Sequence, residues 1–175
     1  MPSKSKTKGK TFEREVCTFL SQLYSDSFTR VPDSGAFTGG KNAYRRETLT
    51  EGQVRAHKGD IIPPDNWKFF NAECKNYAEF PFHNLLTQQV PVLDSWLEQT
   101  RAASDKGDLN ILFFKITRKG TYIAYQLEGS FFHTDRHIDY KDSKNITWRI
   151  TGFDNFFRHN QKSFEHRCKE NLQQR

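Results

Sequence analysis

Residues 58–75 read KGDIIPPDNWKFFNAECK, and this stretch decides the fold. The four residues PPDN at 63–66 are a strong turn signal between two apolar segments. The pattern therefore predicts strands over 58–62 and 67–75 that pair as an antiparallel hairpin. Alternation of apolar and polar residues along the second strand is only partial, which is typical of a strand with both faces covered.

Two acidic residues of this hairpin, Asp60 and Glu73, are predicted to lie side by side. A turn centred between Asn66 and Trp67 places them opposite each other, with Cβ atoms ~5 Å apart. Two carboxylates this close repel each other unless a cation lies between them. Hard oxygen ligands with open positions suit Mg²⁺, and Mn²⁺ is expected to substitute for it.

The segment Glu73-Cys74-Lys75 adds a third side chain to the same site, because positions i and i+2 of a strand face the same side. Lys75 is then placed to polarise the attacking water or to neutralise charge on a scissile phosphate. Cys74 is expected to point into the core, while its backbone carbonyl is a further candidate metal ligand. The pattern also fits an ordinary solvent-exposed pair of charges on a strand, so the spacing by itself leaves a non-catalytic surface open.

Length and composition favour one domain with an aromatic core, because 35% of the 175 residues are hydrophobic and 16 are Phe. No apolar run approaches the ~20 residues of a membrane span. The Lys-rich N-terminus has no apolar segment behind it, unlike a secretory signal. The wide spacing of Cys17, Cys74 and Cys168 suits neither a disulfide framework nor zinc. We therefore expect a cytoplasmic protein, in the host cytoplasm if a phage encodes it.

The charge distribution favours nucleic acid as the partner, since the formal net charge is +6 and the pI is about 9.2. Residues 1–9 are predicted to be a flexible basic arm that either orders on DNA or serves as a solubilising tail, and Lys8 within it is a candidate DNA contact. A long loop at about 35–58 directly precedes the predicted metal site, which favours DNA contact over a merely solvated surface. Its candidate contacts are Lys41, Arg45, Arg46, Arg55 and Lys58.

Residues 10–175 are predicted to form a single α/β domain, with a mixed central sheet flanked by helices. Apolar spacing predicts helices over about 10–25 and 91–104, and a helical C-terminal tail within 153–175. Strands are predicted over 28–31, 109–116 and 121–127, with weaker signals within 137–150.

Asp60 and Glu73-Cys74-Lys75 resemble the motif residues of the PD-(D/E)XK nuclease superfamily, which implies a restriction-endonuclease-like fold and a metal-dependent nuclease. More narrowly, residues 8–15, KGKTFERE, look like the KGxxxERE opening of archaeal-type Holliday-junction resolvases. That resemblance implies that Glu13 helps to bind metal, that Arg14 contacts DNA and that the protein is a homodimer.

Residues 30–35, RVPDSG, are similar to the R-S-x-G-S segment that lies close to the scissile phosphate in the same resolvases, which implicates Arg30 and Ser34. In several nuclease families a Gln on the helix after the catalytic strands touches DNA or braces the Lys, and Gln99 lies on that helix here. Two features depart from the resolvase pattern. The loop before Asp60 is long, and Gly59 occupies the place of the motif's Pro.

The favoured prediction is a Mg²⁺-dependent endonuclease that hydrolyses DNA phosphodiesters, acting as a structure-selective Holliday-junction resolvase in DNA recombination or repair. A second interpretation is a sequence-specific homing or restriction-type endonuclease, in which the 35–58 loop reads bases in a groove. A third is a basic DNA-binding protein with a nuclease-like fold and no catalytic activity.

Overall fold

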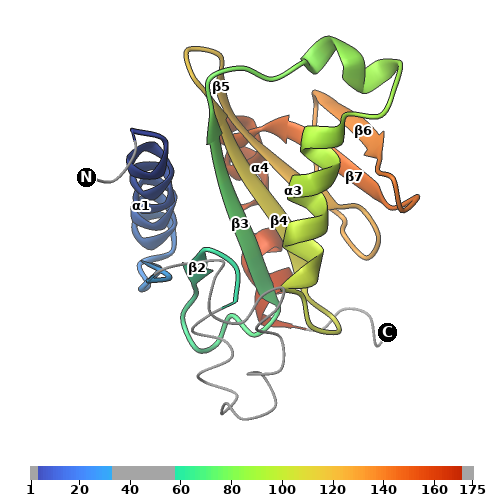
Figure 1. Cartoon of the computed structure of the whole chain (residues 1–175). Coiled ribbons are helices and arrows are strands. Elements are labelled where there is room, and N and C mark those ends of the chain that lie inside the picture. Colours follow the sequence, from blue (N-terminus) through green and yellow to red (C-terminus); the bar gives the residue numbers. More distant parts are fainter. Residues whose placement is uncertain (1–3, 33–57, 171–175) are drawn as a thin grey trace.

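The computed structural model describes residues 4–32 and 58–170. Its centre is a five-stranded sheet in which β3 and β4 run parallel and the remaining neighbours are antiparallel (Figure 1). In spatial order the strands are β3 (Phe70–Tyr77), β4 (Leu109–Ile116), β5 (Gly120–Gln126), β7 (Thr147–Gly152) and β6 (His137–Lys141). The prediction of a mixed α/β fold is therefore confirmed.

Three helices surround this sheet (Figure 1). Helix α3 (Pro91–Ala102) and helix α4 (Phe153–Lys169) cover opposite faces, and α1 (Lys4–Tyr24) lies beside the edge strand β3. The crossover from β3 to the parallel β4 runs through the short 3-10 helix η2 (Phe82–Leu86) and α3. No described helix has the length and apolar character to cross a membrane.

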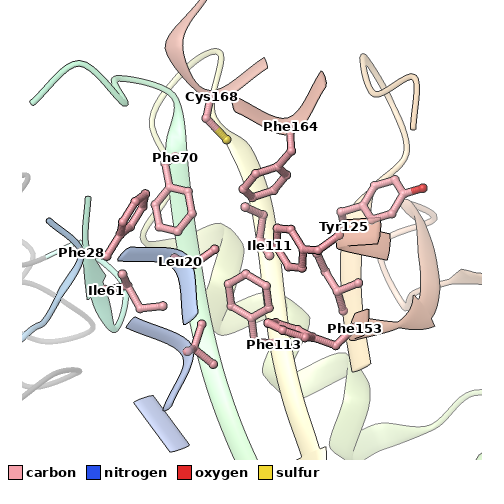
Figure 2. Packing of buried hydrophobic residues seen from close by; sticks show 14 of the residues in the cluster. Leu20, Phe28, Ile61, Phe70, Ile111, Phe113, Tyr125, Phe153, Phe164 and Cys168 are labelled. Carbon is pink, nitrogen blue, oxygen red and sulfur yellow. The ribbon is translucent and has the colours of Figure 1, made fainter. Parts of the chain in front are cut away.

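Each sheet face has its own core. Phe113 packs on the α4 side with Phe157 and Phe164, and its neighbour Phe114 packs on the α3 side with Trp96. Figure 2 shows the first core, where Leu20 of α1 joins the α4 residues. Phe164 is fully buried there, so truncating it to Ala is expected to cost ~3–5 kcal/mol of stability.

Helix α1 begins at Lys4, so residues 4–9 are helical and the prediction of a flexible arm is wrong for them. Lysine is a good helix former, and local and tertiary contacts hold the first turns. Thr11 Oγ1 donates to the Thr7 carbonyl at 2.9 Å, and Asn76 Nδ2 on β3 donates to the Lys8 carbonyl at 3.2 Å.

The predicted hairpin of strands 58–62 and 67–75 is also wrong. Strand β2 (Ile61–Ile62) pairs antiparallel with β1 (Thr29–Arg30) in a separate two-stranded sheet. The two prolines that follow β2 have no N–H to donate, so its ladder cannot extend. Trp67 lies outside β3 and is fully buried, with its ring centroid 4.7 Å from that of Tyr24. One backbone bond, from Asp60 N to the Ala72 carbonyl at 2.9 Å, still brings Asp60 against β3.

The elements whose signals lie in neighbouring residues were predicted at nearly the right positions. Strand β4 has the predicted bounds, and α3 starts at Pro91 but ends at Ala102, two residues early. The region 137–150 resolves into β6 and β7. The predicted helical C-terminal tail is the helix α4 up to Lys169, and it packs on one sheet face against β4, β5 and β7.

Candidate active site

Asp60 is clamped against the edge strand β3 by both its backbone and its side chain. Its N–H donates to the Ala72 carbonyl at 2.9 Å, and its Oδ2 accepts the Cys74 N–H at 2.8 Å. The residue before it, Gly59, has φ +63°, and an added Cβ there would lie 2.3 Å from the Ala72 oxygen. Glycine is therefore required at this position both by conformation and by space, which explains why no proline stands there.

Glu73, Lys75 and Gln99 form a closed triangle of hydrogen bonds. Lys75 Nζ donates to Glu73 Oε1 at 2.9 Å and to Gln99 Oε1 at 2.7 Å. Gln99 Nε2 donates to Glu73 Oε1 at 2.6 Å. Strand alternation puts the first two side chains on the α3 side of β3, and α3 supplies the third. The arrangement fixes the position of an ammonium group beside a buried carboxyl.

Glu13 comes from α1, the helix beside the edge of β3. Its side chain is 10% exposed and forms an ion pair with Arg30 of β1, with Nε 2.5 Å from Oε2. Neither of these two buried atoms has a hydrogen-bond partner. Arg30 thus balances the charge of Glu13 but leaves Glu13 Oε2 without a hydrogen bond.

The carboxyl groups of the site influence one another electrostatically. Burial, followed by the negative charge of Asp60, raises the pKa of Glu73 to about 8 against the opposing effect of Lys75. Burial and then Asp60 also raise the pKa of Glu13, while Arg30 and Lys10 oppose the rise. Asp60 therefore lies within electrostatic reach of both glutamates, and we refer to Glu13, Asp60 and Glu73 together as the carboxyl cluster.

The comparison with protein families agrees with this geometry. The model of a family described as "phage putative PDDEXK endonuclease" matches residues 4–169. The chain belongs to this family. No curated protein and no solved structure matches it significantly. The resemblance to the PD-(D/E)XK superfamily and the restriction-endonuclease-like fold are confirmed, and the match extends through β6, β7 and α4.

The donor set of this PDDEXK endonuclease suits a hard divalent cation. Its carboxylate oxygens are of the kind that Mg²⁺ and Mn²⁺ prefer, and Glu13 Oε2 is buried without a hydrogen-bond partner. The N–H and carbonyl of a strand residue point to the same edge, so the Cys74 carbonyl faces the Asp60 side along with its N–H. Among residues 4–32 and 58–170, no three His, Cys, Asp or Glu side chains are gathered as a metal site. Glu13 is paired with Arg30, and Glu73 with Lys75.

The predicted DNA contacts fall into three groups. Lys8 and Arg14 are exposed on α1. Arg14 and Arg30 both line a shallow groove of about 540 Å³ between α1 and β1. Five predicted contacts lie outside the described residues: Ser34, Lys41, Arg45, Arg46 and Arg55.

Lys58 is a correction to the predicted set of DNA contacts. It is 5% exposed, its Nζ lies 3.0 Å from Asp105 Oδ2, and it also pairs with Asp108. A buried ammonium needs such partners, and here they come from the loop between α3 and β4. Lys58 therefore anchors the chain just before Gly59 and Asp60 instead of facing a polyanion.

Two contacts at the site were not predicted from the sequence. Gln99 was noted as a residue of the right helix, but its bonds to Glu73 depend on how α3 packs on β3. The Arg30–Glu13 pair joins two residues that were assigned separate roles, metal binding and phosphate contact. Its only sequence signal is that both residues lie in segments resembling resolvase motifs.

Proposed function

We propose that this PDDEXK-type nuclease is a divalent-metal-dependent DNA endonuclease whose active site consists of Glu13, Asp60, Glu73 and Lys75. The observation that carries the proposal is that the Asp60 carboxylate is bonded to the Cys74 N–H, directly between Glu73 and Lys75 in the chain, with the Lys75 ammonium 2.9 Å from Glu73 and with Glu13 in electrostatic reach of Asp60. A surface ion pair gives no reason for such burial of like charge, whereas a bound cation does.

Asp60, Glu73 and Glu13 would hold the cation with the Cys74 carbonyl, and Mg²⁺ is the expected ion with Mn²⁺ as a substitute. When bound, such an ion lowers the pKa of water and offsets charge on a phosphoryl oxygen. Lys75 positions water and neutralises charge beside the scissile phosphate. Gln99 keeps the Lys75 ammonium in place by accepting one of its hydrogen bonds at 2.7 Å.

The substrate that we favour is branched DNA, cleaved by a homodimer in the manner of a Holliday-junction resolvase. The support is the resemblance of residues 8–15 and 30–35 to resolvase segments and the ion pair that joins one residue of each segment, Glu13 and Arg30, beside Asp60. Exposed Lys8 and Arg14 extend basic charge along α1 from that cluster. We expect the protein to act in the cytoplasm, where such DNA is present.

Sequence-specific cleavage of linear duplex is the second candidate. It is favoured by the 25 residues between Ser34 and Asp60, which include the four predicted basic contacts that remain after Lys58 is set aside and are long enough to reach into a groove.

A cleavage panel tests both candidates. Synthetic four-way junctions, flaps and linear duplex are incubated with Mg²⁺, Mn²⁺ or EDTA, using wild type and Glu73→Ala. We expect metal-dependent nicking near the junction by wild type alone. Cleavage at one fixed site in every substrate would favour the second candidate. Equal cleavage by both proteins would contradict the site, and metal-insensitive binding without cleavage would leave a DNA-binding protein.

A further inference from the structure

Arg30 is held at the site by its strand and not by its side-chain bonds. In β1 it pairs with Ile61 of β2, the residue that directly follows Asp60, and the Val31 N–H donates to the Asp60 carbonyl at 2.9 Å. The backbone of Arg30 is thus fixed beside the carboxyl cluster. Any change in what its guanidinium contacts must come from rotation of the side chain.

The contact between Arg30 and Glu13 differs from that of an arginine with a settled structural partner. Elsewhere in the protein, Arg149 donates to both oxygens of Asp139, at 2.7 Å each, in the bidentate geometry that makes such pairs strong. Arg30 instead lies with Nε 2.5 Å from Glu13 Oε2, and neither of these two buried atoms has a hydrogen-bond partner. The attraction is mainly that of opposite charges, and another cation can replace it.

A second environment for the guanidinium lies next to the first. The Arg30 side chain is 18% exposed and lines the open groove between α1 and β1. That groove also carries Arg14 and the polar side chains of Thr18, Gln22 and Thr29. These are donors to an anionic oxygen, and the described groove has no carboxylate among its lining residues.

We propose that Arg30 is the resident counter-ion of Glu13 in the metal-free protein, that a divalent cation displaces it, and that the released guanidinium binds a DNA phosphate in the groove. This inference rests on the proposed function, since it concerns the same metal site. A cation on Glu13 and a guanidinium on the same oxygen repel each other, so they exclude one another. Metal and DNA then favour each other's binding, because each is better accommodated when Arg30 has left Glu13.

The test is Mn²⁺ affinity in the absence of DNA, measured by calorimetry or electron paramagnetic resonance at one fixed pH. Arg30→Met removes the competing charge and is expected to bind Mn²⁺ about tenfold more tightly than wild type. Arg30→Lys keeps the charge and is expected to stay within about threefold. Arg14→Met removes a charge from the same groove without touching Glu13 and is the matched control, with affinity expected within about twofold. Unchanged or weaker binding by Arg30→Met would overturn the proposal.

A second measurement covers the case in which Arg30→Met does not fold. The affinity of wild type for a short duplex is compared in Ca²⁺, which is used as a non-cleaving substitute, and in EDTA. We expect at least fivefold tighter binding in Ca²⁺ for wild type and a smaller ratio for Arg30→Gln, which keeps a polar side chain but has no charge to transfer from Glu13 to a phosphate. Equal ratios for the two proteins would overturn the exchange. Failure of wild type to bind Mn²⁺ at all would instead contradict the metal-dependent nuclease, so the two failures are distinguishable.

Discussion

At the scale of single residues, Gly59 has the strictest requirement at the site. A methyl group there would lie 2.3 Å from the Ala72 oxygen, at a φ of +63°. We expect Gly59→Ala to lower the free energy of unfolding by about 2 kcal/mol or more and to abolish Mn²⁺ binding, because Asp60 must move off β3.

Gly9 provides the matched control for this substitution. It lies in the interior of α1, where an added Cβ would be 4.0 Å from Glu13 Oε1, an ordinary contact. Gly9→Ala should therefore stabilise the protein by roughly 0.5–1 kcal/mol and leave Mn²⁺ affinity unchanged. Urea unfolding measures both effects, and equal stability of the two variants would contradict the steric argument.

Glu73 should make the stability of the metal-free protein depend on pH. Burial and the charge of Asp60 raise its pKa to about 8 in the folded state. A carboxyl with a raised folded pKa contributes stability below its unfolded value, near 4.5, and loses it as the pH rises through about 8. The free energy of unfolding should fall over this window, and Glu73→Gln should remove most of the fall, by on the order of 2 kcal/mol.

Urea titrations at several pH values measure this slope. Glu79, an exposed carboxyl on the segment after β3, is the control, and Glu79→Gln should keep the wild-type slope. A slope that persists in Glu73→Gln would assign the effect to another group.

At the scale of elements, a helix or strand could be predicted from the sequence where its signal lies in neighbouring residues. The unbroken apolar run of β4 and the proline that opens α3 are encoded in a few neighbouring residues, and both were predicted correctly. The pairing of β2 was not predicted correctly. The turn signal at residues 63–66 contains two prolines, and these end the strand ladder instead of joining two paired strands. The start of α1 depends in part on Asn76, which lies 68 residues after Lys8.

The same distinction applies to the site. Glu73 and Lys75 were predicted together because a strand repeats every two residues. The contact of Asp60 with β3 was predicted, although by a hairpin that does not exist. Gln99 lies 26 residues from Glu73, and the acidic partner Asp105 lies 47 residues from Lys58. No spacing rule relates residues so far apart. The acidic partners of Lys58 could therefore not be predicted, and Lys58 was interpreted as a DNA contact.

The position of the segment just before Asp60 is therefore expected to depend on the ion pairs of Lys58 with Asp105 and Asp108. Lys58→Met leaves Asp108, whose side chain is 2% exposed, without its cation. Burial already raises the pKa of Asp108, and Lys58 opposes that rise. We expect a loss of about 3 kcal/mol or more in the free energy of unfolding.

Asp108→Asn in the same background should recover part of this loss, because it removes the uncompensated charge. A double-mutant cycle measured by denaturant unfolding gives the coupling energy of the pair. Additive effects of the two substitutions would contradict a stabilising ion pair between Lys58 and Asp108.

At the scale of the whole molecule, basic residues continue beyond the carboxyl cluster to one end of the sheet. The turn between β4 and β5 carries exposed Arg118 and Lys119, and the Thr117 N–H joins it to the end of β3 through the Tyr77 carbonyl at 2.9 Å. The first turns of α1 meet the same strand at Asn76. We expect a duplex arm to lie along this end of the protein.

Removing these charges should weaken binding to long DNA selectively. Arg118→Gln with Lys119→Gln should lower affinity for a long duplex several-fold and reduce the slope of log affinity against log salt by about 1 for each phosphate that the protein no longer neutralises. Lys162→Gln on the exposed side of α4, across the sheet, is the control. An equal reduction in affinity for the two variants would indicate a nonspecific charge effect.

The position of β3 at the edge of the sheet has a consequence for aggregation. An open strand edge is a template for other chains, and the proposed site lies along this edge. Asp60 blocks part of it, since its carboxylate occupies the Cys74 N–H at 2.8 Å. Asp60→Ala should therefore make the protein prone to aggregation, which light scattering on mild heating detects. Asp60→Asn keeps an acceptor oxygen and should remain monodisperse. For the proposed active site, Asp60→Asn is therefore the better substitution with which to seek a stable complex with DNA.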